Sequence, residues 1–446
     1  MRNAFDSGLI SEFARHYGFH YDRVDPHGLV DDVLVDMERG LEGQSSSLPM
    51  IPAYISPVSK VPSGKTVIAL DAGGTNLRAA LVKFDDNGKV REGANSKVPM
   101  PGTRGSVGAE EFFDEIAGVT APLIRDAPGP IEGIGFCFSY PMEITSDADG
   151  ILMAFSKEVD APEVIGKAIG RGLRDALARL NLKVPGRIVL LNDTVATLLS
   201  GLLELPAACE GAEGRAGPVV GCILGTGFNT AYSEKSIPKI GFESASNPQI
   251  VVCETGAFAH RYMGALDREF DRATNNPGAY TLEKAAAGAY LGPLTLHILK
   301  QAVRDGVLAC GRSGELLAME SLQTKDLNAF LRAPFAGGIL GGLFGKDEEA
   351  AMASLVRIAS IVTERGALFA AAMTAGAVIR AGGGCDPLSP ARIAMEGTTY
   401  LVYHGMRTAM ESWLHVMLAR GTLRSYLIAP VEQASLFGAA AAALTE

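Results

Sequence analysis

Two stretches of this chain share one plan: an apolar strand, a glycine-rich turn and a second apolar strand that returns. The first is VIALDAGGTNLRAALV, at 67–82, and the second is VGCILGTGFNTAYSE, at 220–234. Glycines permit backbone angles and close approaches that other residues forbid, and successive turn N–H groups form a concavity that binds anions. Their wide separation favours two related half-domains over a short-period repeat. Two such hairpins facing one another would hold a phosphate group between them, whereas the alternative is a chance likeness of two glycine hairpins.

The rest of the chain alternates between strand and helix patterns. Apolar residues recur every three or four positions over 1–42, which predicts helices, and the Ser- and Pro-rich stretch 45–64 predicts an extended connector. The predicted strands are 66–70, 77–84, one from Val90, 131–138, 187–191, 219–224, 230–233 and 391–395. The predicted helices are 110–124, 163–180, 194–205, a mostly helical region from Leu282, and 351–379. Strands that alternate with helices predict an α/β architecture.

Length and composition limit the class of protein. The 446 residues are enough for two or three domains, and 47% apolar with 20% charged residues is typical of a globular protein. The net charge of -10 argues against non-specific binding to nucleic acid or anionic membranes. Six cysteines without a CxxC pair favour reduced thiols in a cytoplasmic protein. The charged, amphipathic start lacks the apolar core of a signal peptide, and no stretch is long and apolar enough to span a bilayer.

The first glycine turn follows a carboxylate at the end of a predicted strand. Asp71 at this place could hold Mg²⁺ directly or through water, because Mg²⁺ prefers one or two carboxylates together with phosphate oxygens. The hydroxyl of Thr75 adds a donor to the turn. In the second turn, Thr226 can donate to a phosphoryl oxygen as charge develops during transfer, and Asn229 can instead face a polyhydroxy substrate. We expect Arg78 to brace the first hairpin against an acidic neighbour rather than to contact phosphate.

A second carboxylate, Asp193, lies between a predicted buried strand and a predicted helix in LLNDTVATLL, at 190–199. One interpretation is structural, since Asp is a preferred N-cap residue. The other is a general base, because a carboxylate in a cleft that excludes water can take a hydroxyl proton as the oxygen attacks phosphorus. Taken singly, five further polar residues are more typical of ordinary surface and helix positions than of a site: Ser139, Ser156, Lys157, Glu254 and Glu283.

Three common site motifs do not fit the sequence. GLFGK near Gly345 is not a Walker loop, because Lys346 is followed by Asp347 rather than by Ser or Thr. GIGFCF lacks the last glycine of a dinucleotide fingerprint. No HExxH and no His/Cys cluster occurs, which argues against a dedicated zinc site.

Taken together, the remaining stretches resemble the hexokinase family. LDAGGTNLR is similar to that family's first phosphate motif, LGTGFNTAY to its second, and LNDTVAT to its catalytic-aspartate segment. GFCFSYP resembles its sugar-binding serine strand and FSK its Trp-Thr-Lys segment. SNPQIVVCETGAF and NPGAYTLEKAAAGAYLG resemble the two segments that carry sugar-binding glutamates. The motifs follow the family's order over nearly the whole chain, and the length suits a single-unit enzyme.

The resemblance implies the actin-like ATPase (ribonuclease H-like) fold of sugar kinases, actin and heat-shock ATPases, an α/β architecture of two domains around a deep cleft. It implies an N-terminal helical segment, 1–51, packed on the large domain. A small domain at 52–199, completed by 431–446, would carry the first phosphate motif and the catalytic aspartate. A large domain at 200–430 would carry the second phosphate motif and the sugar-binding glutamates.

The resemblance also implies individual roles. Asp193 would be the catalytic base, and Asp71 would lie on the Mg²⁺ side. The residues implied to bind sugar hydroxyls are Ser139, Ser156, Lys157, Asn192, Asp193, Asn229, Glu254 and Glu283. The residues implied to bind phosphate or nucleotide are Asp71, Gly73, Gly74, Thr75, Asn76, Gly225, Thr226, Gly227, Ser435 and Gly438.

Some positions depart from the family pattern. Phe155 stands for the usual tryptophan, Thr255 for the usual aromatic residue after the first glutamate, and Val252 for an asparagine. These changes affect the segments that would form the sugar pocket. At the C-terminus, ASLFGAA keeps only Ser435 and Gly438 of the family's Gly-Ser-Gly-Lys-Gly segment, which leaves phosphoryl donors other than ATP open.

The activity that the resemblance implies is ATP-dependent phosphorylation of a hexose at its 6-hydroxyl, with glucose the expected sugar, as the first step of glycolysis. ATP would be the co-substrate and Mg²⁺ the cofactor of a cytoplasmic monomer or homodimer without nucleic-acid or membrane partners. One alternative is a kinase for another hexose or a hexosamine, which the three departures keep open. Another is a non-catalytic sugar sensor on the same fold, which would not need Asp71, Asp193 and Thr226 together.

Overall fold

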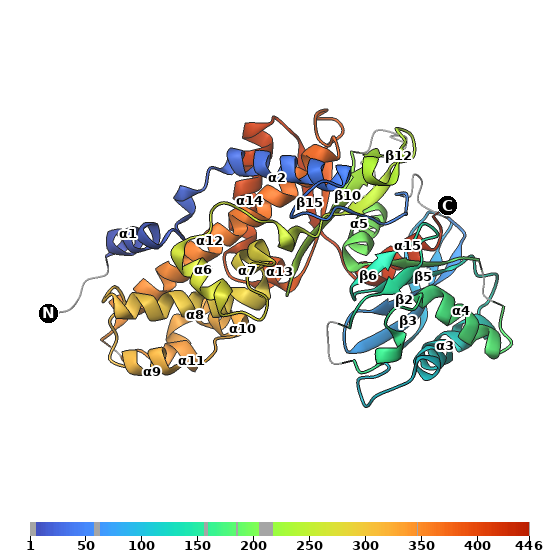
Figure 1. Cartoon of the computed structure of the whole chain (residues 1–446), viewed down its shortest axis with the longest axis horizontal. Coiled ribbons are helices and arrows are strands. Elements are labelled where there is room, and N and C mark those ends of the chain that lie inside the picture. The colour runs from blue at the N-terminus through green and yellow to red at the C-terminus, as the bar shows by residue number, and fades with distance from the viewer. Residues whose placement is uncertain are drawn as a thin grey trace.

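The protein is built on two β-sheets, each covered by helices. The computed structural model describes residues 6–57, 63–155, 159–183, 186–204, 217–345 and 347–445. One sheet has five strands in the order β4-β3-β2-β5-β8, and the other has six in the order β1-β13-β10-β9-β14-β15. Figure 1 shows the two layered bodies side by side, with the helix-rich body on the left and the five-stranded sheet on the right. The predicted α/β architecture is confirmed.

The five-stranded sheet begins with the first glycine hairpin. Its strands are β2 (Thr66–Ala72), β3 (Asn76–Phe84), β4 (Val90–Pro99), β5 (Ile134–Phe138) and β8 (Ile188–Leu191). β2, β3 and β4 are antiparallel, whereas β5 and β8 run parallel to β2. Every residue of β5 and β8 is buried, because helices cover both faces of this part of the sheet. α3 (Ala109–Arg125) and α4 (Ile169–Arg179) pack on one face, and α15 (Ala434–Ala442) packs on the other.

The six-stranded sheet contains the second glycine hairpin. Its strands are β1 (Ile51–Pro52), β9 (Val219–Leu224), β10 (Phe228–Glu234), β13 (Gln249–Val252), β14 (Ala391–Glu396) and β15 (Tyr426–Pro430). α5 (Asp193–Glu204), which also packs against α15, covers one face, and α12 (Glu349–Arg380) covers the other. α5 therefore lies between the two sheets and connects their cores.

The remaining elements are further helices and two separate two-stranded sheets, β6-β7 and β11-β12. The helices are α1 (Ser7–Tyr17), α2 (Pro26–Glu42), α6 (Ala265–Arg272), α7 (Thr281–Ala286), α8 (Gly288–Arg304), α9 (Ser313–Ala318), α10 (Thr324–Arg332), α11 (Gly338–Gly341), α13 (Thr398–Val402) and α14 (Met406–Leu414). The short strands are β6 (Met142–Ile144), β7 (Gly150–Leu152), β11 (Ser236–Ile237) and β12 (Phe242–Glu243). In the part of the chain that the structure describes, no helix has the length and apolar character needed to cross a membrane.

The N-terminal helices predicted over 1–42 are confirmed as α1 and α2, and both pack into the core around α12. α2 begins at a proline behind Asp25, whose carboxylate accepts from the backbone N–H of His27, and it ends at Gly43 in the left-handed conformation. These are ordinary start and stop signals, so the local sequence is enough to define the helix.

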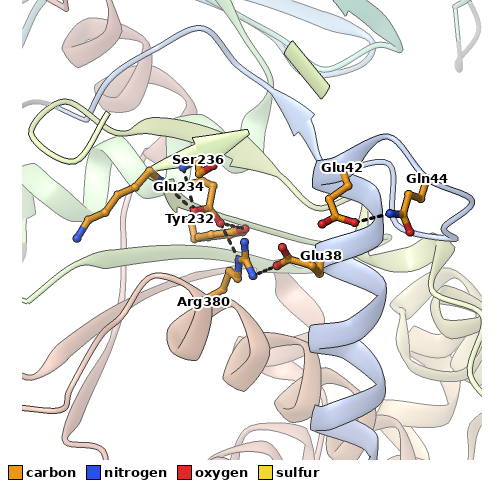
Figure 2. A network of polar contacts seen from close by, with 8 residues as sticks. Glu38, Glu42, Gln44, Tyr232, Glu234, Ser236 and Arg380 are labelled. Carbon is orange, nitrogen blue, oxygen red and sulfur yellow. Dashed lines mark hydrogen bonds and ion pairs between the residues drawn. The ribbon is translucent and has the colours of Figure 1, made fainter. Parts of the chain in front are cut away.

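A polar network joins α2 to the six-stranded sheet. Nε of Arg380, the last residue of α12, lies 2.8 Å from Oε2 of Glu234 on β10, and Nη1 contacts Glu38 on α2. The hydroxyl of Tyr232 donates to the same Glu234 oxygen over 2.8 Å. Figure 2 shows Arg380 between the two glutamates. The Arg380 guanidinium thereby links α2 to β10, the second strand of the second glycine hairpin.

One expectation about local structure is wrong. The segment 163–180 is not one helix: a short turn at Pro162–Val164 is separated from α4 by Gly166, whose φ of 81° is unsuited to a helix. Within the extended connector predicted over 45–64, Ile51 and Pro52 form β1 and pair with β13, and 58–62 lie outside the described residues. The domain boundaries implied at 51, 199 and 430 stay a prediction.

Candidate active site

The first glycine turn lies at the end of β2, where Asp71 pairs in register with Cys137 of the parallel strand β5. Gly74 has a φ of 147°, which a residue with a side chain rarely adopts, and its carbonyl accepts a hydrogen bond from the Tyr140 hydroxyl. This contact holds the turn against the end of β5. Gly73 and Thr75 are exposed, so the turn presents its backbone and one hydroxyl outward.

Arg78 braces this hairpin, as expected. Its Nη2 lies 2.7 Å from Oε2 of Glu92 on β4 and 2.6 Å from Oε1 of Gln433, just before α15. Arg78 therefore connects the first hairpin to the C-terminal helix.

The second glycine turn is fixed through its backbone carbonyls. The Gly225 carbonyl accepts from the Gly288 N–H and from the Thr399 hydroxyl, each over 2.8 Å. The Thr226 carbonyl accepts from the Ala289 N–H over 3.0 Å. Because the carbonyls point toward α8 and α13, the exposed Thr226 side chain remains on the outer side of the turn.

Asp193 is the first residue of α5, but it does not cap the helix. The cap is supplied by Asn192, whose Oδ1 accepts from the Val195 N–H over 2.9 Å. The structural interpretation of Asp193 as an N-cap is therefore wrong, and the helix start places its carboxylate at the cavity described below.

The buried thiol of Cys137 links residues that the sequence could only treat separately. Its Sγ lies 3.9 Å from Oγ of Ser139 and is hydrogen-bonded to Ser435. Burial raises the pKa of the Cys137 thiol far above its usual range, and the nearby carboxylates of Asp71 and Asp193 raise it further. The thiol therefore stays protonated near the two carboxylates.

A cavity of about 580 Å³ lies between the ends of the two sheets, a size typical of small-molecule sites. The predicted site residues that line it are Ser139, Asn192, Asp193, Gly227, Asn229, Glu254 and Glu283. Asn192 and Asp193 come from the junction of β8 and α5, Gly227 and Asn229 from the second hairpin, and the other three from the loops after β5 and β13 and from the start of α7. The fold brings together most of the residues implied to bind sugar.

Glu254 is held in an unusual position on the cavity wall. Its backbone is left-handed, with φ 55° and ψ 50°, which a residue with a side chain adopts only when surrounding contacts require it. Its Oε1 accepts from Nδ2 of Asn229 over 2.9 Å. Burial raises the pKa of Glu254, the Asn229 hydrogen bond lowers it, and Asp193 and Glu283 raise it again.

The Glu283 carboxylate lines the cavity and packs closely against two glycines, Gly227 and Gly256. A Cβ atom on Gly227 or on Gly256 would lie 2.9 Å from its Oε2, so only glycine leaves room for the carboxylate. That oxygen accepts from the Phe228 N–H over 3.2 Å. The next residue, Lys284, is buried and anchors the short helix α7 through Asp271, at 2.5 Å. Burial raises the pKa of Glu283.

Glu396, at the end of β14, was not among the residues predicted from the sequence. Burial raises the pKa of Glu396, and the carboxylates of Asp193 and Asp71 raise it further, so the three acids lie near one another. The Thr197 hydroxyl donates to its Oε2 over 2.9 Å. The sequence did contain a signal for Glu396, because this carboxylate directly follows the strand predicted at 391–395. Asp193 stands in a similar place, separated from the end of β8 by one residue.

Tyr280, also missed, lines the same cavity in a left-handed backbone conformation, three residues before Glu283. No motif marked it, since it lies in a loop whose position depends on tertiary contacts.

Other predicted residues lie away from the lining or outside the described residues. Gly438 packs α15 against α5, because a Cβ atom there would lie 2.0 Å from the Ala196 carbonyl. The Asn76 amide donates to the Thr75 hydroxyl over 3.2 Å. Ser156 and Lys157 fall outside the described residues. The nucleotide role of Gly438 and Asn76 and the sugar role of Ser156 and Lys157 stay predictions.

Two family models, both described as hexokinase, match residues 10–203 and 219–445. Hexokinase-1 of Oryza sativa subsp. japonica is 30% identical over 435 residues, which covers 91% of this chain and 84% of the rice protein. Hexokinase-3 of Homo sapiens is 30% identical over 298 residues, which covers 65% of this chain and 30% of the human protein.

Solved structures agree in fold. A hexokinase from Schistosoma mansoni complexed with glucose is 24% identical, with a TM-score of 0.73 and coverage of 98% of this chain and 99% of that chain. Another hexokinase crystal structure is 23% identical, with a TM-score of 0.75 and the same coverage. The actin-like ATPase fold is therefore confirmed. The family matches also favour a kinase over a non-catalytic sensor. The chain belongs to the hexokinase family, as a hexose kinase with ATP as its co-substrate.

Proposed function

We propose that this chain transfers the γ-phosphoryl group of ATP to the 6-hydroxyl of glucose, giving glucose 6-phosphate and ADP, as the first step of glycolysis. The observation that carries the proposal is the convergence of Asp193, Glu254 and Glu283 on one cavity. We further propose that the protein acts in the cytoplasm as a monomer or homodimer. Free thiols at the described cysteines are compatible with a reducing compartment.

Sugar binding would rest on paired acceptors and donors at the cavity wall. The carboxylates of Glu254 and Glu283 accept hydrogen bonds from sugar hydroxyls, while the amides of Asn192 and Asn229 and the Ser139 hydroxyl complete the set. A site built to hydrogen-bond hydroxyls rejects molecules that lack them, because its polar groups would be left unpaired.

Asp193 would act as the general base. Its carboxylate takes the proton of the 6-hydroxyl as that oxygen attacks the γ-phosphorus in line. The two glycine turns would hold the phosphates, with the backbone N–H groups of Gly73–Thr75 on one side and the Thr226 hydroxyl on the other. Closure of the two bodies over the cavity would exclude water and limit ATP hydrolysis.

We propose Mg²⁺ as the cofactor, on the side of Asp71. The donor set fits, because Asp71 supplies a carboxylate oxygen at the end of β2 and Glu396 lies close to it. Hard oxygen ligands of this kind suit Mg²⁺, which typically uses one or two carboxylates together with phosphate oxygens. When bound, the metal would neutralise charge on the phosphate oxygens.

A sugar panel in a coupled ADP-release assay tests the proposal. Glucose, mannose, fructose, galactose and N-acetylglucosamine are compared with ATP as donor, and ATP, GTP and polyphosphate are compared with glucose. We expect glucose and ATP to give the highest kcat/KM. A higher value for another sugar would contradict the glucose assignment, and absence of sugar-dependent ADP release would contradict the kinase mechanism.

One observation favours a second candidate, a kinase for an N-acylated hexosamine. Part of the cavity wall is apolar: Val252, Met142, Ile144 and Met153 line it, together with Ile51 and Pro52 of β1. An acyl group could bury apolar surface there, which a plain hexose does not do. N-acetylglucosamine in the same panel separates the two candidates.

A further inference from the structure

A second cavity, of about 390 Å³, lies between the N-terminal segment and the start of α6, and three arginines line it. Arg23 comes from the 3-10 turn after α1, Arg261 from the loop before α6, and Arg268 from α6 itself. None of the described residues that line this cavity is an aspartate or a glutamate. In a chain with a net charge of -10, this is a local concentration of positive charge.

Two of these arginines carry charge that no ion pair balances in the described part of the chain. Nη1 of Arg23 donates to the Arg15 carbonyl over 2.8 Å, and Nη1 of Arg268 donates to the Met263 carbonyl over 2.5 Å. A peptide carbonyl positions a guanidinium without neutralising it, and the other N–H groups remain available as donors. Arg261 differs, because its Nε lies 3.0 Å from Oδ2 of Asp32.

The backbone around this cavity is closely packed. Gly18, at the end of α1, has a φ of 81°, and a Cβ atom there would lie 2.9 Å from Cα of Gly264. A Cβ atom on Gly264 would lie 2.3 Å from the Tyr17 carbonyl, so both glycines are needed for this contact. The Gly264 N–H donates to Asp267, which is paired with the fully buried Arg365 at 2.6 Å. The two walls that carry Arg23 and Arg268 are therefore fixed relative to each other.

From these contacts we infer that the cavity binds the phosphate group of a small, soluble phosphorylated molecule, at a site separate from the catalytic cavity. Guanidinium groups pair with phosphate through several charge-assisted hydrogen bonds. Arginines that enter from different segments can surround a tetrahedral group, whereas a planar carboxylate presents its oxygens in one plane only. The cavity is concave and of small-molecule size. The inference goes beyond the proposed function and does not depend on which sugar is phosphorylated.

The site is connected to the catalytic cavity through one continuous segment. The loop that carries Arg261 and Met263 begins at Glu254, and the Phe258 carbonyl in that loop accepts from the Thr281 hydroxyl, two residues before Glu283. A ligand that binds the loop at Arg261 is placed to change how both glutamates are held. We therefore expect occupancy of the site to change the KM for sugar.

The test is titration calorimetry of the full chain with inorganic pyrophosphate, without Mg²⁺ and at low ionic strength. The decisive variant is the double substitution Arg23→Gln/Arg268→Gln, and Arg332→Gln, at an exposed arginine on α10, is the matched control. Thr226→Val reports on pyrophosphate bound at the catalytic turns. We expect the affinity of the arginine-lined cavity for pyrophosphate to fall at least tenfold in the double variant. The same affinity should be unchanged in Thr226→Val and in Arg332→Gln.

The inference is overturned if the double variant, with a melting temperature like that of the wild type, binds pyrophosphate as tightly as the wild type does. It is also overturned if Thr226→Val removes all binding. Equal or tighter binding of citrate at the same site would contradict the assignment to phosphate. Because calorimetry needs no turnover, failure of the proposed kinase activity would leave these outcomes unchanged.

Discussion

Nδ2 of Asn229 donates a hydrogen bond to Oε1 of Glu254 over 2.9 Å, and the other end of the same amide is fixed by the backbone. Oδ1 of Asn229 accepts from the N–H groups of Thr230, at 2.8 Å, and Thr255, at 3.2 Å. Because two backbone donors meet Oδ1, the amide has one orientation, and its NH₂ group faces the carboxylate. The second hairpin thereby positions a glutamate that lies on a separate loop.

Replacing Asn229 by alanine should weaken sugar binding. A hydrogen bond to a charged group contributes about 1.5–3 kcal/mol, so we expect the KM for sugar to rise about ten- to a hundredfold. The Asn229 hydrogen bond also lowers the pKa of Glu254, so its loss should move the acidic limb of sugar binding to higher pH. Steady-state kinetics and calorimetry across pH measure both effects. Asn95→Ala, at an exposed position on β4, is the control, and an unchanged KM and pH limb would contradict the role.

Asp193→Asn should remove the proposed general base and leave the helix intact. Asn192, not Asp193, supplies the cap of α5, so the substitution leaves that hydrogen bond in place. General-base catalysis contributes about 10²–10⁴-fold, and we expect kcat to fall by that factor. Sugar affinity measured by calorimetry should change only a few-fold. A variant that keeps the full rate would show that another group accepts the proton.

Gly256→Ala should displace Glu283 without touching the substrate. The added Cβ would lie 2.9 Å from Oε2 and 3.0 Å from Cβ of Glu283, too close for either atom to remain in place. We expect the KM for sugar to rise at least several-fold. Gly118→Ala on α3 is the matched control: its Cβ has no atom within 4 Å, and alanine should stabilise the helix by up to about 1 kcal/mol. Equal sugar KM values in the two variants would contradict the steric account.

His260 should make the free energy of unfolding depend on pH. Burial lowers the pKa of His260 to about 4, and the Arg365 guanidinium contributes to the shift. Between this value and about 6.5, the unfolded chain binds more protons than the folded chain, so stability is full above about 6.5 and is lost as pH falls toward 4. From these two pKa values, we expect a loss of about 2 kcal/mol between pH 7 and pH 5.

Urea unfolding at the two pH values measures this loss. His260→Phe keeps a ring against Phe369, whose centroid lies 4.4 Å from that of His260, and should reduce the difference between the two pH values. His404→Gln, at an exposed position, is the control. The same pH difference in His260→Phe and in the wild type would assign the effect to other groups.

Local signals were enough to predict the hairpins and the main helices. Gly-rich turns between apolar strands define β2–β3 and β9–β10, and ordinary caps define α2. The prediction of one helix over 163–180 was wrong. Gly166 has a positive φ, which interrupts the helix although the apolar periodicity around it continues. Short strands such as β1 depend on a partner strand about two hundred residues away, and local patterns do not contain that partner.

The sequence by itself, through the resemblance of its motifs to a known family, was enough to predict which residues carry the chemistry: Asp193, Glu254, Glu283 and the two glycine turns. Only the tertiary structure decided how these residues are held: Asn192 rather than Asp193 caps α5, and Asn229 fixes Glu254. Tertiary contacts also place Glu396 near Asp71 and Asp193, and Arg23 on the same cavity as Arg268. The physical reason is that burial, charge proximity and hydrogen-bond partners depend on segments that are far apart in the chain. The local sequence does not specify how close those segments lie in space.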